Sequence, residues 1–213
     1  MSNVEQAILN VEVDGPKASV GAAVEAHAGE VIESGTSRFL AESRELNGAP
    51  AFGSFVKTEP DPAVFGLVYN VSTHSIEPNR RPTAYGKTEH ELRMEQPQIF
   101  ELLKTEFEAA VVGFRDGGDI QQVLPPQPPH IHSFVQPCSE AEIKGLTGNG
   151  DFLRTIVGSS RLPVDDLMIA AIRKAWQARA YDMAYLVSLG KDLCRLVRDD
   201  YDRLSSILRR VAQ

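Results

Sequence analysis

Residues 64–71 read VFGLVYNV and form the most apolar run in the first half of the chain. The run predicts a strand that is buried on both faces. Other stretches of strand-like composition surround it at residues 29–35, 37–43 and 51–58. Turn signals separate these stretches, the clearest being Asn47-Gly48. Short strands at close spacing, joined by Gly and Pro turns, predict a small β-barrel or a sandwich.

The pattern changes after this region. Residues 88–112 carry apolar side chains at helical spacing, with Pro97 at a plausible first-turn position, and they predict a helical insertion in the barrel domain. Residues 131–135 predict a final strand.

The last part of the chain has a different composition. Residues 151–213 hold 11 Lys and Arg against 8 Asp and no Glu, whereas residues 1–150 hold 12 of the 13 prolines. The shift predicts a boundary near residues 148–150. Pro163 marks a helix start with acidic residues in the first turn, and apolar residues recur every three or four positions from 186 to 211. We expect this stripe to pack within the molecule rather than against another subunit.

These patterns together predict an α+β protein. We expect a flexible leader over residues 1–28, a barrel domain with a helical insertion over residues 29–148, and an α-helical segment over residues 149–213.

Composition excludes several broad classes. The chain has 213 residues, a net charge of −7 and a pI near 5.3, so its whole surface is not expected to coat DNA or an anionic membrane. Two cysteines provide no disulfide framework and suit a reducing compartment, which favours the cytoplasm. Residues 1–10 lack a secretory signal, and no run of about 18 apolar residues predicts a membrane span.

Three of the strand stretches resemble a known family. Residues 29–34 (GEVIES), 52–56 (FGSFV) and 65–69 (FGLVY) resemble the HAS barrel, which precedes the motor domain of HerA-type DNA translocases and has a relative in the α and β subunits of rotary ATP synthases. The core resemblance covers about residues 29–136. The whole chain is similar to stand-alone bacterial HAS-barrel proteins, in which a helical tail replaces the motor.

The resemblance implies a partner-binding role. In HerA-like motors the barrel is a collar that helps to assemble a hexamer and receives a NurA-type nuclease. This chain would then be a non-catalytic adaptor, a detached collar for a HerA-like ATPase and a NurA-type nuclease in DNA end processing or repair, and a possible homo-oligomer. No catalytic residue, cofactor or metal is expected. The residues most suited to partner binding are a basic pair and a proline-rich stretch: Arg80, Arg81, Pro125, Pro126, Pro128 and Pro129. The proline-rich stretch could equally be a rigid strap across the fold.

One alternative is a nucleotide-binding protein or enzyme. Residues 81–88 (RPTAYGKT) match the phosphate-binding loop pattern at Gly86-Lys87-Thr88, but Arg81 replaces its first glycine. Pro82 removes one of the N–H groups that would wrap a phosphate. A plain strand-to-helix turn explains the same residues.

Two weaker patterns remain open. His130 and His132 would share one face of a strand, with Cys138 six residues beyond, but zinc needs a third or fourth ligand that nothing indicates. The basic residues of the last segment could contact nucleic acid, which would make the chain a nucleic-acid-binding module, although interleaved Asp residues are typical of a solvated helix face. These residues are Arg173, Lys174, Arg179, Arg195, Arg198, Arg209 and Arg210.

Overall fold

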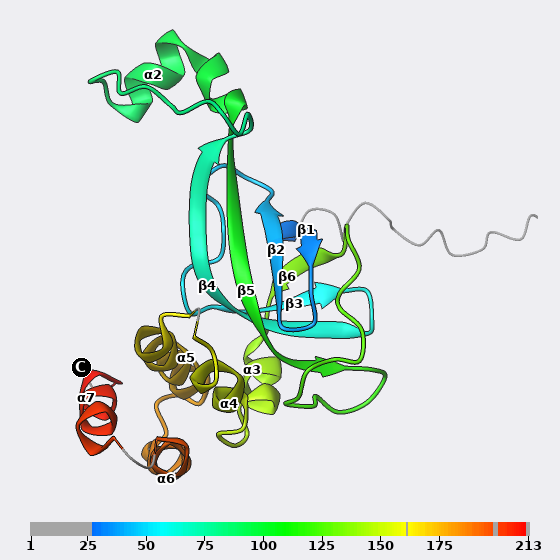
Figure 1. Cartoon of the computed structure of the whole chain (residues 1–213), viewed down its shortest axis with the longest axis vertical. Coiled ribbons are helices and arrows are strands. Elements are labelled where there is room, and N and C mark those ends of the chain that lie inside the picture. The colour runs from blue at the N-terminus through cyan, green and yellow to red at the C-terminus, as the bar shows by residue number, and fades with distance from the viewer. Residues whose placement is uncertain (1–26, 161, 198–199, 212–213) are drawn as a thin grey trace, which may run out of the picture.

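The computed structural model describes residues 27–160, 162–197 and 200–211. The expected leader, apart from its last two residues, lies outside the described residues. Six strands form a closed barrel in the order β1-β2-β5-β4-β3-β6, and every neighbouring pair is antiparallel. The strands are β1 (Gly29–Ser34), β2 (Arg38–Ser43), β3 (Phe55–Glu59), β4 (Ala63–Ser75), β5 (Leu103–Arg115) and β6 (Phe134–Pro137). Helices follow the barrel, which confirms the predicted α+β class (Figure 1).

The barrel is filled by one set of small and aromatic side chains. Because side chains alternate between the two faces of a strand, every strand sends about every second residue inward. An added Cβ on Gly66 of β4 would lie 2.9 Å from Ala109 Cβ and 2.9 Å from the ring of Phe39, so glycine is required where β4 passes this ring. The interior set is Val31, Phe39, Ala41, Val56, Val64, Val68, Phe107, Ala109, Val111 and Val135.

The predicted helical insertion over residues 88–112 is wrong in its second half. Helix α2 (Glu89–Glu95) begins at a capping box between Thr88 and Glu91, and the short 3₁₀ helix η1 (Pro97–Leu102) follows. The chain then enters β5, which pairs with β2 on one side and β4 on the other. The helical spacing was misleading because long-range pairing and burial inside the barrel outweigh the local pattern.

Two other predicted strands are shifted. In the stretch 51–58 only β3 is extended, because Gly53 adopts a left-handed conformation with φ +78° and turns the chain before it. The strand expected over residues 131–135 is β6, which begins at Phe134, because His132 has φ +70° and lies in a turn.

A second apolar core joins the outside of the barrel to the helices. These are α3 (Glu140–Leu146), α4 (Phe152–Val157), α5 (Val164–Ala178), α6 (Met183–Leu196) and α7 (Tyr201–Val211). Phe65 and Leu67 on the outer face of β4 pack in the same cluster as Phe152, Leu167 and Leu193 of the helices. Figure 1 shows all five helices at one end of the molecule.

The helical part agrees with the sequence in most respects. Helix α5 begins directly after Pro163, as predicted, and the stripe over residues 186–211 is buried inside the molecule at Leu189, Leu193 and Ile207. The first helix of this part, α3, begins before the boundary expected near residues 148–150, because Ser139 and Glu142 form a capping box there.

Strands β4 and β5 continue beyond the barrel as a long hairpin, paired from Ala63↔Arg115 to Ser75↔Leu103. Residues 76–102 connect the two strands and carry α2 and η1; we call them the arm. Figure 1 shows the arm at the far end of the hairpin, away from the helices.

Candidate functional site

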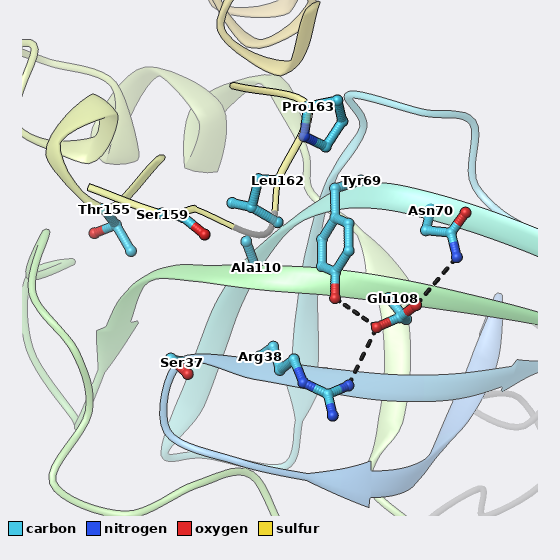
Figure 2. A pocket seen from close by; sticks show the side chains of 10 residues that line it. All are labelled: Ser37, Arg38, Tyr69, Asn70, Glu108, Ala110, Thr155, Ser159, Leu162 and Pro163. Carbon is cyan, nitrogen blue, oxygen red and sulfur yellow. Dashed lines mark hydrogen bonds and ion pairs between the residues drawn. The ribbon is translucent and has the colours of Figure 1, made fainter. Parts of the chain in front are cut away.

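A polar cleft of about 630 Å³ lies between the outer wall of the barrel and the connection from α4 to α5. Arg38 of β2, Tyr69 and Asn70 of β4, and Glu108 of β5 line its barrel side. Figure 2 shows these side chains converging on the Glu108 carboxylate, with the α4–α5 connection opposite.

Glu108 accepts hydrogen bonds at both of its carboxylate oxygens. Tyr69 Oη donates to Oε2 at 2.5 Å, Arg38 Nη1 contacts the same oxygen at 3.1 Å, and Asn70 Nδ2 donates to Oε1 at 3.0 Å. Burial alone would raise the pKa of Glu108, but the hydrogen bonds from Tyr69 and Asn70 and the charge of Arg38 together lower it. Burial, reinforced by hydrogen bonding to Glu108, raises the pKa of Tyr69 to about 12.

These shifts determine what the cleft can do chemically. Near neutral pH, Glu108 is ionised with both oxygens engaged, and Tyr69 keeps its proton. The pair therefore offers neither a free general base nor a phenolate nucleophile. The network ties three neighbouring strands together on the face that meets the helices. The sequence analysis missed it, and its only local signal is Tyr69-Asn70, a polar pair that ends the apolar part of residues 64–71.

We expect Glu108→Gln to lower the free energy of unfolding by about 1–3 kcal/mol at pH 7, because a half-buried charge-assisted network loses its anion. The lowered pKa adds a pH dependence: stability is complete above the unfolded pKa of about 4.3 and is lost as the pH falls through the folded pKa. Urea unfolding between about pH 7 and pH 3 should show a flatter acid limb for the variant.

Glu33→Gln is the matched control, since Glu33 pairs with the same Arg38 but is exposed. The control should change stability by less than about 1 kcal/mol. Equal effects of the two substitutions would show that the Glu108 network does not hold these strands together.

The predicted partner-binding residues lie in two separate places. Arg80 and Arg81 are exposed on the arm and line a hollow of about 200 Å³ with Tyr85 and Phe100. Arg80 Nη1 lies 3.9 Å from the Glu77 carboxylate, so of these two arginines only Arg81 has no ion pair with a residue that the structure describes. The structure does not bring these arginines near the proline-rich stretch.

The prolines cross the barrel near the turn between β3 and β4. Pro125 and Pro129 are buried, Pro128 is half-buried and Pro126 is exposed. The stretch lines a hollow of about 280 Å³ together with Pro60, Pro62 and Phe114, and Ser34 Oγ donates a hydrogen bond to the Pro129 carbonyl. The observed contacts are those of a strap, with only the middle of the stretch open to a partner.

Gly86-Lys87-Thr88 does not form a phosphate-binding loop. Lys87 Nζ pairs with Glu95, and the Thr88 hydroxyl accepts from the Glu91 backbone N–H at 3.3 Å. The loop leads from an antiparallel hairpin into the seven residues of α2, so these two side chains serve to cap and brace a short helix. The structure gives no support to the nucleotide-binding alternative.

His132 and Cys138, which the sequence grouped as possible metal ligands, lie beside different side chains. His132 Nδ1 contacts Glu30, whereas Cys138 lies beside Glu142, Lys57 and Arg115, and burial raises the pKa of its thiol. Within the described part of the chain no three His, Cys, Asp or Glu side chains are grouped closely enough to hold a metal ion.

Most of the basic residues in the last segment have local roles. Arg179 binds the carbonyls of Lys144 and Thr147 at the end of α3, and Arg195 pairs with Asp192. Arg198 lies outside the described residues.

Among the helices that the structure describes, none has the length and apolar character needed to cross a membrane.

Comparison with known proteins agrees with the barrel described above. No curated protein matches the chain significantly. Residues 28–117 match the family model of the HAS barrel domain, a range that begins just before β1 and ends just after β5. The match, together with the closed six-stranded barrel, shows that the chain carries a HAS barrel domain.

Proposed function

We propose that the chain is a non-catalytic adaptor, a barrel collar for a HerA-like ATPase and a NurA-type nuclease in DNA end processing or repair. The HAS barrel domain supports this proposal, because the barrels of HerA-like motors help to assemble the ring and receive the nuclease. In the cleft at Glu108, both carboxylate oxygens accept hydrogen bonds, and this arrangement fits a module that binds proteins rather than transforms a substrate.

The observation that carries the proposal is the exposure of the arm. No residue from 76 to 104 is buried. The arm nevertheless has defined structure, with a complete capping box at Thr88 and Glu91 and a guanidinium of Arg93 4.3 Å from the centre of the Phe100 ring. A helix of seven residues is unstable in water without tertiary contacts. Contact with a second protein would supply the missing burial.

Apolar side chains are also exposed along the arm. Met94 is 75% exposed, Ile76 52% and Tyr85 46%. Together with Arg81 they provide the apolar anchors and the arginine that protein interfaces favour. We therefore propose that the ATPase contacts the arm.

We expect Met94→Glu to weaken binding of the HerA-like ATPase from the same organism by at least about tenfold, because a charge would replace an apolar anchor. Binding of the purified full chain to the purified ATPase can be measured by calorimetry. Val187→Glu is the control, since Val187 is a comparably exposed apolar residue on α6. Absence of any complex between the wild-type chain and the ATPase would reject the adaptor function, and equal losses in both variants would reject the arm as its contact.

A further inference from the structure

A groove of about 560 Å³ runs along the exposed side of α5. Ala170, Arg173, Lys174 and Gln177 recur at intervals of three and four residues and so share one side of this helix. Phe52, from the loop before β3, and Val211, at the end of α7, form the borders of the groove. It is distinct from the arm and from the cleft at Glu108.

Three aromatic residues line this groove: Phe52, Trp176 and Tyr181. The rings of Trp176 and Tyr181 meet edge to face with centres 5.0 Å apart, and Trp176 Nε1 donates to the Asp182 carbonyl at 3.0 Å. Tyr181 is 57% exposed and Phe52 40%. Exposed aromatic rings held in place by their neighbours form a surface on which other planar groups can stack.

The turn that holds Tyr181 is strained. Ala180 and Tyr181 both adopt left-handed backbone conformations, with φ of +51° and +62°, although neither is glycine. The Tyr181 backbone N–H donates to the Trp176 carbonyl at 3.0 Å and helps to maintain this turn. Strained conformations of this kind concentrate at functional positions. The turn places the Tyr181 ring at the surface beside Trp176.

Two cations line the groove beside the aromatic rings, Arg173 and Lys174. Arg173 Nε donates to the Val211 carbonyl at 3.4 Å and Arg173 Nη2 to the Arg210 carbonyl, which holds the end of α7 beside the groove. Lys174 forms no ion pair with any residue that the structure describes and remains available for an anionic ligand.

We propose that this groove binds single-stranded nucleic acid. The bases would stack on Tyr181, Trp176 and Phe52, and the phosphates would contact Arg173 and Lys174. Proteins that bind single strands without sequence preference combine a basic groove with aromatic stacking platforms, because every base has a flat face and every nucleotide a phosphate. The proposal extends beyond the adaptor function and does not depend on it.

Trp176 is the only tryptophan of the chain, so its fluorescence reports directly on the groove. Titration of the full chain with a short oligo(dT) at low salt should quench this fluorescence in a saturable manner, and binding should weaken as salt is raised. Fluorescence anisotropy of the labelled oligonucleotide measures the same affinity independently.

Tyr181→Gly separates binding from folding. Glycine suits the left-handed conformation at this position, so the variant should fold at least as stably as the wild type while losing a stacking platform. We expect its affinity for oligo(dT) to fall about tenfold or more. Tyr85→Gly is the control, because it removes a similarly exposed tyrosine from the arm and should leave the affinity unchanged.

The charge test pairs Lys174→Glu with Arg81→Glu on the arm. Lys174→Glu should weaken binding and reduce its salt dependence, whereas Arg81→Glu should change neither. Absence of saturable quenching by oligo(dT) at low salt would overturn the proposal. Equal loss of affinity in both charge variants would also overturn it, as would quenching by an acidic peptide but not by oligo(dT), which would assign the groove to a protein ligand.

Discussion

Phe107→Ala is expected to lower the free energy of unfolding by about 3–5 kcal/mol, because a fully buried aromatic side chain is deleted from the closed interior of the barrel. An added Cβ on Gly29 would lie 2.9 Å from the Phe107 ring, which shows how tightly β1 packs against it. The barrel closes around this ring, so little collapse can fill the cavity that alanine would leave. Urea unfolding followed by circular dichroism measures the change.

Phe100→Ala is the matched control for this prediction. The residue is also a phenylalanine of the stretch expected to form one helix, but it lies half-buried in η1 on the arm. Its replacement should cost less than about 1.5 kcal/mol, because less apolar surface leaves contact and the arm can adjust. If the two variants lost similar amounts of unfolding free energy, Phe100 and Phe107 would be equally buried. That result would contradict the position of Phe107 inside the barrel.

The fold could be predicted from local patterns where local and long-range preferences agree. Residues 64–71 are apolar on both faces because the inner face of β4 fills the barrel and the outer face meets the helices. The second half of residues 88–112 was misread because apolar residues from Ile99 to Phe107 recur at helical spacing, although residues 105–109 (TEFEA) alternate as a strand does. Pairing with β2 and β4, which are distant in sequence, decides between the two periods.

The candidate sites were harder to predict for a related reason. The Glu108 network joins residues of three strands, and the groove on α5 combines Phe52 with residues of the last segment. Because the residues of each site lie far apart in the sequence, no local pattern predicts either site. The isolated patterns that did attract attention, such as Lys87 and His132, have neighbouring acidic partners that a one-dimensional reading does not show.

Gly53→Ala is the second substitution expected to have a large effect, at about 2–5 kcal/mol. Gly53 has φ +78°, and an added Cβ would lie 2.3 Å from the Cβ of Ala170 on α5. The cost therefore has two parts: strain of the backbone, about 1–2 kcal/mol, and overpacking between the barrel loop and α5, about 1–3 kcal/mol.

Ala170→Gly separates the two parts in a double-mutant cycle, because it removes the methyl group that the new Cβ would meet. Alone it should cost about 1 kcal/mol through its effect on the helix. Combined with Gly53→Ala it should relieve the overpacking but not the backbone strain, so the two changes should be coupled by about 1–3 kcal/mol. Additivity within about 0.5 kcal/mol would show that the barrel loop and α5 do not touch as described. Because Phe52 adjoins this contact, the same cycle tests whether barrel and helices together build the groove.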